Sequence, residues 1–121
     1  MRYASSIRNI DRFALTEMEL HGVRIPEGAL CVLWLAAGNR DPEVFDLPDD
    51  FIADRMPNRH LGFGGGVHFC LGAPLARMET QIAVRAILTR TRAIELIGAP
   101  RFGPNAGFNN VLRQMARLDA G

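Results

Sequence analysis

Apolar and polar residues alternate in the first part of the chain, which predicts short strands. Met18-Glu19-Leu20 and Val23-Arg24-Ile25 each alternate in this way, and His21-Gly22 between them has the composition of a two-residue turn. We therefore expect a β-hairpin over residues 18–25. The next run, residues 29–37, is apolar on every side and predicts a buried helix or a buried strand.

The middle of the chain has no such pattern. Between residues 39 and 69 no helical or strand period is sustained, and Pro42, Pro48 and Pro57 interrupt the segment. A stretch of that length without regular structure is unusual in a compact domain, and a binding loop is one common reason for it. We expect irregular backbone here.

The clearest helix is predicted over residues 75–91. Pro74 stands just before it, where the first helical turn tolerates a missing N–H group. One face of this helix is apolar and consists of Leu75, Met78, Ile82 and Ala86. Its polar face carries Arg85, Arg90 and Arg92. Beyond the helix, turn signals at 98–100 and 103–107 surround short stretches such as Val111-Leu112, which predicts a small terminal hairpin.

Composition and charge narrow the class of protein. The 121 residues are 48% hydrophobic and 22% charged, which suits one small domain. With 14 basic and 13 acidic residues the net charge is +1, so neither a nucleic acid nor a membrane surface is an expected partner. No apolar leader follows Met1, and we expect a soluble protein of the reducing cytoplasm. Of the two cysteines, Cys31 lies in the apolar run and is expected to be a core residue.

The other cysteine has an unusual setting. Five of the 12 glycines lie within eleven positions around Cys70, namely Gly62, Gly64, Gly65, Gly66 and Gly72. Glycines let a backbone approach a bulky flat ligand, and a cysteine just before a helix has its thiolate stabilised by unpaired N–H groups. The flanking residues are apolar: Phe63, Val67, Phe69 and Leu71. This pattern favours a soft metal held against a large apolar ligand.

These residues resemble a known family. The segment Phe63-Gly64-Gly65-Gly66-Val67-His68-Phe69-Cys70-Leu71-Gly72 fits every constrained position of the haem-binding signature F-G-x-G-x-[HR]-x-C-x-G of cytochromes P-450. Leu75-Ala76-Arg77-Met78-Glu79 has the L-A-R-x-E form of the family's L helix, and residues 39–42 and 58–61 are similar to bacterial members. The resemblance runs from residue 2 to about residue 92.

The resemblance implies a fold class and a place within that fold. The family fold is mainly α, and the chain is expected to be its C-terminal haem-binding portion, an α+β arrangement of short β-hairpins, a meander loop, the cysteine-ligand loop and the L helix. Residues 1–121 would form one such portion. The family's N-terminal part and its I helix would be absent.

The resemblance also implies the roles of individual residues. Cys70 would be the axial thiolate ligand of the haem iron, which makes it both the metal ligand and the catalytic residue. Phe63 would shield the sulfur, and Gly64, Gly66 and Gly72 would form the cofactor-binding loop. His68 and Arg12 match the cations that hold the haem propionates.

Two further arginines match structural positions of the family. Arg2 resembles the arginine of the K-helix E-x-x-R motif, and Arg55 resembles the meander arginine that pairs with that motif. The glutamate of the motif should lie three residues before Arg2, where this chain has no residue. Arg2 and Arg55 are therefore expected to lack their carboxylate, and the chain is expected to be a fragment.

The implied activity is that of a bacterial-type monooxygenase. The complete protein would insert one oxygen atom from O2 into a small organic substrate, with electrons from a ferredoxin-type donor that docks near Cys70. This chain alone is expected to be inactive and to need the missing N-terminal half as a partner. One alternative is a catalytically dead remnant that at most binds haem weakly.

The second alternative is a small zinc module that uses His60, His68 and Cys70. The gap between His68 and Cys70 is shorter than the usual spacing of paired zinc ligands, and the sequence offers no evident fourth ligand. A phosphate-binding loop is less favoured still, because the glycines fit neither nucleotide-binding spacing and no lysine follows them.

Overall fold

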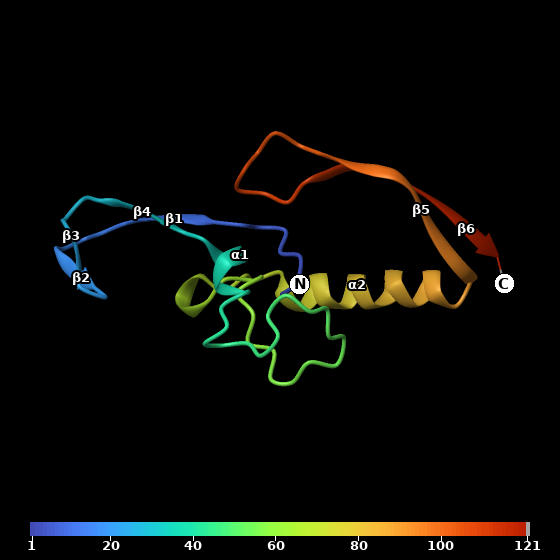
Figure 1. Ribbon diagram of the computed structural model, residues 1–121, viewed down its shortest axis with the longest axis horizontal. Coiled ribbons are helices and arrows are strands. Elements are labelled where there is room, and N and C mark those ends of the chain that lie inside the picture. Colours follow the sequence, from blue (N-terminus) through green and yellow to red (C-terminus); the bar gives the residue numbers. More distant parts are fainter. Residues whose placement is uncertain (121) are drawn as a thin grey trace. The chain divides into compact units, whose positions relative to one another are not determined.

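The computed structural model describes residues 1–120, which form two compact units. The first unit comprises Met1–Gly62 together with Asn105–Asn109, and the second comprises Phe63–Pro104 together with the described residues from 110 onwards. The chain thus leaves the first unit at residue 62 and returns to it for one short segment. Figure 1 follows this path by colour along the sequence.

The first unit contains two small antiparallel ribbons. Strand β1 (Ile10–Phe13) pairs with β4 (Leu30–Leu33), and β2 (Met18–Leu20) pairs with β3 (Val23–Ile25). His21 and Gly22 make the turn between β2 and β3. Both residues have a positive φ, of 49° and 77°, which a tight two-residue hairpin turn of this type requires. The predicted hairpin is confirmed, and it lies inside a longer excursion between β1 and β4 (Figure 1).

The apolar run at residues 29–37 is not one buried element, and that prediction is wrong. It divides at Trp34 into the exposed strand β4 and a single helical turn, α1 (Leu35–Gly38), in which Leu35 is buried. Cys31 is half-buried in β4 opposite Arg12, so it is not the core residue that the sequence predicted. The reason is that a two-stranded ribbon has no second layer over it among the described residues of this unit.

The irregular segment was predicted over residues 39–69, and apart from a 3-10 turn at residues 66–68 it contains no helix or strand. Polar contacts hold residues 39–62 in place. Asn39 is fully buried, its side-chain N–H donates to Ser5 Oγ at 2.7 Å, and its Oδ1 accepts the Leu61 N–H at 2.7 Å. Arg2 is 5% exposed and donates to the carbonyl oxygens of Asn39, Pro48 and Asp50 at 2.8–3.0 Å. The centre of this unit is therefore polar and hydrogen-bonded.

Residues 105–109 complete the first unit by pairing with its N-terminal segment. The Arg8 N–H donates to Gly107 O at 2.8 Å, the Asn109 N–H donates to Ser6 O at 2.7 Å, and Ile7 forms an isolated antiparallel bridge with Phe108. These bonds attach residues 105–109 to the N-terminal segment of the chain. Asn9 lies so close that a Cβ on Gly107 would meet its Oδ1 at 2.8 Å.

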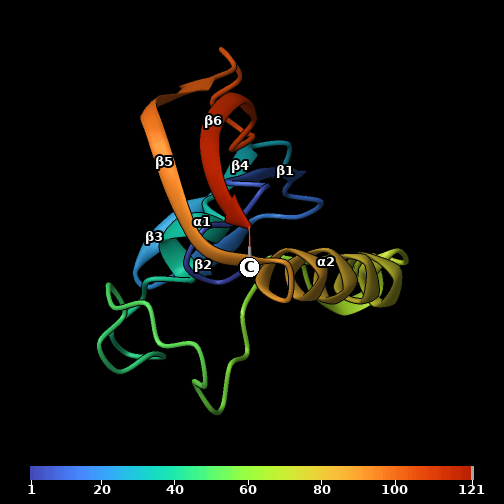
Figure 2. The same ribbon diagram turned by 90° about the vertical axis from the view of Figure 1, so that its right-hand side faces the viewer.

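The second unit consists of a 3-10 turn, one long helix and one long ribbon. The turn η1 (Gly66–His68) precedes α2 (Ala73–Leu88), and β5 (Thr91–Phe102) then pairs antiparallel with β6 (Val111–Ala120). Figures 1 and 2 show the chain reversing just after α2 to enter β5. Pro74 occupies the first turn of α2, as predicted.

Three predictions for this unit need correction. The helix begins at Ala73 and ends at Leu88 rather than covering residues 75–91, because Thr89 caps it with its N–H and Oγ1 on Arg85 O. Arg90 and Arg92 therefore lie outside the helix, the first in a turn and the second in β5. The terminal hairpin is also larger than expected, with strands of 12 and 10 residues.

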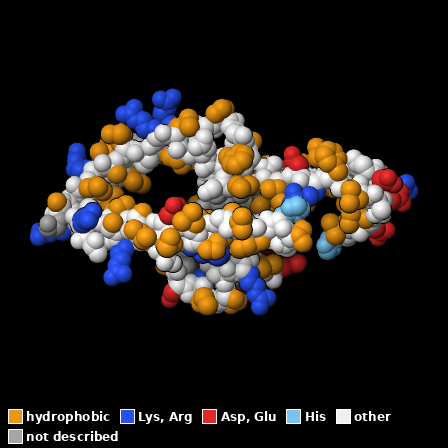
Figure 3. All heavy atoms as spheres, turned by 180° about the vertical axis from the view of Figure 1, so that it is seen from behind, with side chains coloured by type: hydrophobic (Ala, Val, Ile, Leu, Met, Phe, Trp, Pro, Cys, Tyr) orange, Lys and Arg blue, Asp and Glu red, His pale blue; other side chains and the backbone are white. Residues whose placement is uncertain are grey.

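Helix α2 carries apolar side chains around most of its circumference rather than on one face. The larger ones are exposed by 41–64%: Leu75, Met78, Ile82, Val84, Ile87 and Leu88. Figure 3 shows hydrophobic side chains at the surface along this helix. A helix that is apolar on all sides is typical of a protein interior, so α2 has the composition of a central helix. None of the helices within residues 1–120 is both long and apolar enough to cross a membrane.

Candidate functional site

The loop at residues 63–72 closes on itself through backbone hydrogen bonds. The Cys70 N–H donates to Phe63 O at 2.9 Å, and the Phe69 N–H donates to Gly66 O at 3.1 Å. The Ala73 N–H then donates to Cys70 O at 3.1 Å, which joins the loop to the first turn of α2. Cys70 is thereby fixed at the start of the helix, and its side chain is exposed.

The glycines of this loop serve two different purposes. Gly64 and Gly66 have φ of 72° and 60°, a left-handed conformation that residues with a Cβ adopt at a cost. Gly72, by contrast, has an ordinary φ of −80° and precedes the first helical residue. A Cβ at Gly72 would lie 3.9 Å from Cys70 Sγ, so the glycine leaves one flank of the sulfur clear. That open flank is the kind of space in which a bulky ligand on the sulfur can lie.

Several apolar side chains of the Cys70 loop are exposed to solvent. Val67 is 97% exposed, Leu71 is 98% exposed and Phe69 is 48% exposed, whereas Phe63 is buried. The Phe63 and Phe69 rings meet edge to face with their centroids 6.2 Å apart. Apolar side chains in water are unfavourable, and they become favourable when a large apolar group covers them. A single thiolate amid apolar side chains fits an iron porphyrin, since thiolates are soft ligands and the porphyrin is flat and apolar.

The start of α2 adds to the electrostatic character of the site. The first N–H groups of a helix are unpaired and its dipole is positive at this end, and both effects favour a nearby anion. No side chain caps this end of the helix. A thiolate at Cys70 would therefore meet backbone N–H groups rather than a competing acidic side chain, because the first turn of α2 contains none.

The structure brings together six of the seven predicted site residues. Phe63, Gly64, Gly66, His68, Cys70 and Gly72 all belong to the second unit, and His68 is exposed at the end of η1. Arg12 belongs to the first unit, where it lies half-buried in β1 and its Nη1 donates to Asp11 O at 2.8 Å.

Arg2 and Arg55 both bind backbone carbonyl groups of the irregular segment. Arg55 donates to the carbonyl oxygens of Asp46 and Leu47, while its Nε is buried without a hydrogen-bond partner in the described part of the chain. Burial, and then the charges of Arg55 and Arg40, lower the pKa of Arg2, although an arginine keeps its proton at neutral pH. Within residues 1–120 neither arginine forms a salt bridge with a carboxylate.

Comparison with known proteins shows the family to which the chain belongs. The family model for cytochrome P-450 matches residues 1–94, which is most of the chain. The chain belongs to the cytochrome P-450 family. Haem is the cofactor of that family, in agreement with the donor set at Cys70.

Individual members of the P-450 family are similar over nearly the whole chain. Cytochrome P-450 119 of Sulfolobus acidocaldarius is 41% identical over 118 residues, which cover 98% of this chain and 32% of that protein. The beta-dihydromenaquinone-9 omega-hydroxylase of Mycobacterium tuberculosis is 40% identical over 113 residues, covering 93% of this chain and 23% of that protein. The chain thus spans about a third or less of the length of these relatives.

A solved P-450 structure confirms the expected fold. The crystal structure of a thermophilic cytochrome P-450 from Sulfolobus tokodaii has a TM-score of 0.95 and 37% sequence identity to this chain. The match covers 99% of this chain and 32% of that one. The mixed α and β elements described above are therefore part of the P-450 fold, as the signature implied.

Sequence reasoning gave no role to one residue that touches the P-450 loop. Arg77 lies in the second turn of α2, and its guanidinium carbon is 4.8 Å from the centroid of the Phe63 ring. Long side chains on a helix point back toward its N-terminus, and this direction is what brings Arg77 over a residue that precedes the helix. The sequence does contain a signal for this contact. Arg77 is a cation about one turn into the helix that follows the cysteine loop, and from there its side chain can reach back to the loop.

The residues of the zinc alternative are not assembled into a site. His60 Nδ1 accepts a hydrogen bond from the Gly62 N–H at 3.1 Å and belongs to the first unit, whereas His68 and Cys70 belong to the second. Among residues 1–120 no three His, Cys, Asp or Glu side chains lie close enough together to hold a metal ion. A zinc module would need such a group.

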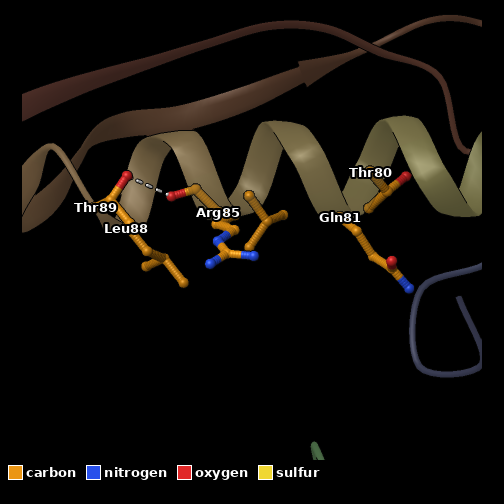
Figure 4. A pocket seen from close by; sticks show the side chains of 6 residues that line it. Thr80, Gln81, Arg85, Leu88 and Thr89 are labelled. Carbon is orange, nitrogen blue, oxygen red and sulfur yellow. Dashed lines mark hydrogen bonds between the residues drawn. The ribbon is translucent and has the colours of Figure 1, made fainter.

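A shallow groove also runs along α2. Figure 4 shows its lining, which comes from this helix and the residue after it: Thr80, Gln81, Val84, Arg85, Leu88 and Thr89. The lining is mostly apolar, and the hydrogen bond drawn in it joins Thr89 Oγ1 to Arg85 O at 2.9 Å. This groove is the flank of a helix rather than a site with catalytic groups.

Proposed function

We propose that Cys70 binds the iron of a haem through its thiolate and that residues 63–72 form the wall of the haem site on the side of the cysteine. The observation that carries the proposal is the closed loop itself. It holds an exposed Cys70 between a 2.9 Å hydrogen bond to Phe63 O and the first turn of α2. The clear flank at Gly72 and the uncovered side chains of Val67 and Leu71 support a large apolar ligand at this place.

The bound haem supplies the activation of O2 from which one oxygen atom is inserted into an organic substrate. The protein's part is to bind, shield and orient. The Cys70 thiolate donates electron density to the iron, and Phe63 excludes water from the sulfur. His68 and Arg12 hold the two propionates by charge-assisted hydrogen bonds. Gly64 and Gly66 give the loop the left-handed turns that carry the cysteine to the start of α2.

The activity proposed for the complete protein is monooxygenation of a small organic molecule. The mycobacterial relative is named an omega-hydroxylase, which supports this class of reaction. The electrons come from a ferredoxin-type donor that docks on the protein surface near Cys70. We also propose that the protein is cytoplasmic, because cysteines stay reduced in the cytoplasm and the site is built on a cysteine that forms no disulfide.

We further propose that residues 1–121 form one haem-binding portion and that this portion by itself is inactive. Helix α2 carries uncovered apolar side chains on most sides, and Arg2 and Arg55 donate to carbonyl groups where a carboxylate would be the stronger partner. Relatives are about three times longer or more, and their additional chain can supply both the cover and the carboxylate.

The ferrous carbon monoxide difference spectrum tests the ligand. The purified chain is reconstituted with haem, reduced and exposed to carbon monoxide, beside Cys70→Ser and the matched control Cys31→Ser. We expect the red-shifted band of a thiolate-bound haem in the unmodified chain and in Cys31→Ser, and its loss in Cys70→Ser. The band surviving in Cys70→Ser, or no band from the unmodified chain, contradicts the proposal for this chain.

A further inference from the structure

We propose that Arg77 is a positioning residue for the thiolate loop. It holds the Phe63 ring against the second turn of α2, and Phe63 in turn holds the Cys70 amide. Arg77 also brings a permanent positive charge to the cysteine end of the helix. The first role concerns the chain alone, whereas the effect of the charge on the iron rests on the proposed function.

The contacts form a short continuous path. The Arg77 guanidinium carbon lies 4.8 Å from the Phe63 ring centroid, inside the range of a cation–π interaction. The same ring meets Phe69 edge to face, and the Phe63 carbonyl oxygen accepts the Cys70 N–H at 2.9 Å. Phe63 is 9% exposed although Val67 and Leu71 in the same loop are almost fully exposed. The ring is thus one fixed point of an otherwise open loop.

The position of the charge follows from the direction of helical side chains. Arg77 is the fifth residue of α2, and its side chain reaches back toward the helix N-terminus to lie over Phe63. Its charge has the same sign as the N-terminal end of the helix dipole. A cation at this end of the helix stabilises the reduced state of a redox group bound to Cys70 relative to its oxidised state.

Amide hydrogen exchange in the chain without haem tests the positioning role. The variants are Arg77→Gln, Arg77→Lys as the rescue that keeps the charge, and Arg85→Gln as the matched control. Arg85 lies two turns further along α2, in the groove beside Leu88 (Figure 4). We expect the Cys70 amide to exchange about two- to fivefold faster in Arg77→Gln, the factor that one exposed cation–π contact supplies. Arg77→Lys and Arg85→Gln should stay close to the unmodified chain.

Arg77→Gln could also destabilise α2 itself, and faster exchange of the amides of residues 77–88 would reveal this. A second set of variants covers that case. Phe63→Leu removes the ring and leaves Arg77 in place, and Arg77→Met is a second neutral helix former. If the two side chains act through one contact, Arg77→Met adds nothing to the effect of Phe63→Leu on Cys70. Additive effects, or unchanged exchange in every Arg77 variant, overturn the positioning role.

The reduction potential of the haem-loaded chain tests the charge. We expect Arg77→Gln to shift it to a more negative value, Arg77→Lys to restore it and Arg85→Gln to leave it unchanged. An unchanged potential in Arg77→Gln overturns this half of the inference. The absence of a thiolate band from the unmodified chain refutes the proposed function instead, and the exchange experiment then still decides the positioning role.

Discussion

Arg2 and Asn39 join the start of the chain to the start of its irregular segment: Arg2 Nη1 donates to Asn39 O at 2.8 Å, and both residues are buried. The Asn39 side chain extends this contact to Ser5 and Leu61, at 2.7 Å each. The Arg2 guanidinium carbon also lies 5.1 Å from the Phe45 ring centroid. One asparagine therefore links three segments of the first unit, and most of them have no regular secondary structure.

Asn39→Ala should destabilise the first unit strongly. The substitution leaves the Leu61 N–H without its partner and removes one from Ser5 Oγ, and we expect a loss of about 2–4 kcal/mol in the free energy of unfolding. Urea unfolding followed by the fluorescence of Trp34, the single tryptophan, reports on this unit. Asn58→Ala, at an exposed position, is the control and should have little effect. Equal losses in the two variants would refute the role given to Asn39.

The glycines of the cysteine loop should differ in their tolerance of alanine. Gly64→Ala and Gly66→Ala force a Cβ into the left-handed region, and each should cost about 1–2 kcal/mol. Gly65→Ala is the matched control, because Gly65 has an extended φ of −160° and a Cβ there meets nothing within 4 Å. Urea unfolding followed by the helical circular dichroism of α2 measures all three. A Gly65→Ala loss as large as the other two would contradict the assignment.

Ala73 should not tolerate a larger side chain. It is fully buried where the cysteine loop meets α2, and Ala73→Leu should cost about 1–3 kcal/mol through overpacking. Ala83→Leu introduces the same side chain at an exposed position of the same helix and should be close to neutral. Thermal unfolding followed by circular dichroism distinguishes the two, and a neutral Ala73→Leu would show that the junction has free space.

The uncovered side chains of α2 should bind apolar dyes. Ile82→Lys and Leu88→Lys each remove an exposed apolar side chain from the helix, and we expect lower fluorescence of a bound naphthalene sulfonate dye and higher solubility of the chain. Helix content should stay unchanged, because both positions are exposed and lysine is a good helix former. Thr80→Lys on the same helix is the control. Unchanged dye binding in both variants would mean that these side chains are already covered in solution.

The successful predictions concern local features. The hairpin at residues 18–25 was predicted because its alternation and its turn lie within eight consecutive residues. The cysteine loop was predicted because Cys70 and the turn-forming glycines lie within ten consecutive residues. Helix α2 was correctly predicted to be a helix, but its first and last residues were wrong. A sequence pattern does not show which residue caps a helix.

The wrong predictions concern burial. The run at residues 29–37 and Cys31 were predicted to be buried because they are apolar. Apolar character predicts burial only when a second layer is present to cover it. In the described residues β4 has no second layer, so most of its side chains are exposed and Cys31 is only half-buried.

The sequence by itself determined the family, the thiolate candidate Cys70 and the residues of its loop, because ligand chemistry and backbone conformation reside in consecutive residues. Tertiary structure alone decided what holds those parts in place. Arg2 meets Asp50 from 48 residues away, Arg8 meets Asn109 from 101 residues away, and Arg77 reaches back over Phe63. Such contacts depend on where the backbone returns in space, and no short period in the sequence encodes that.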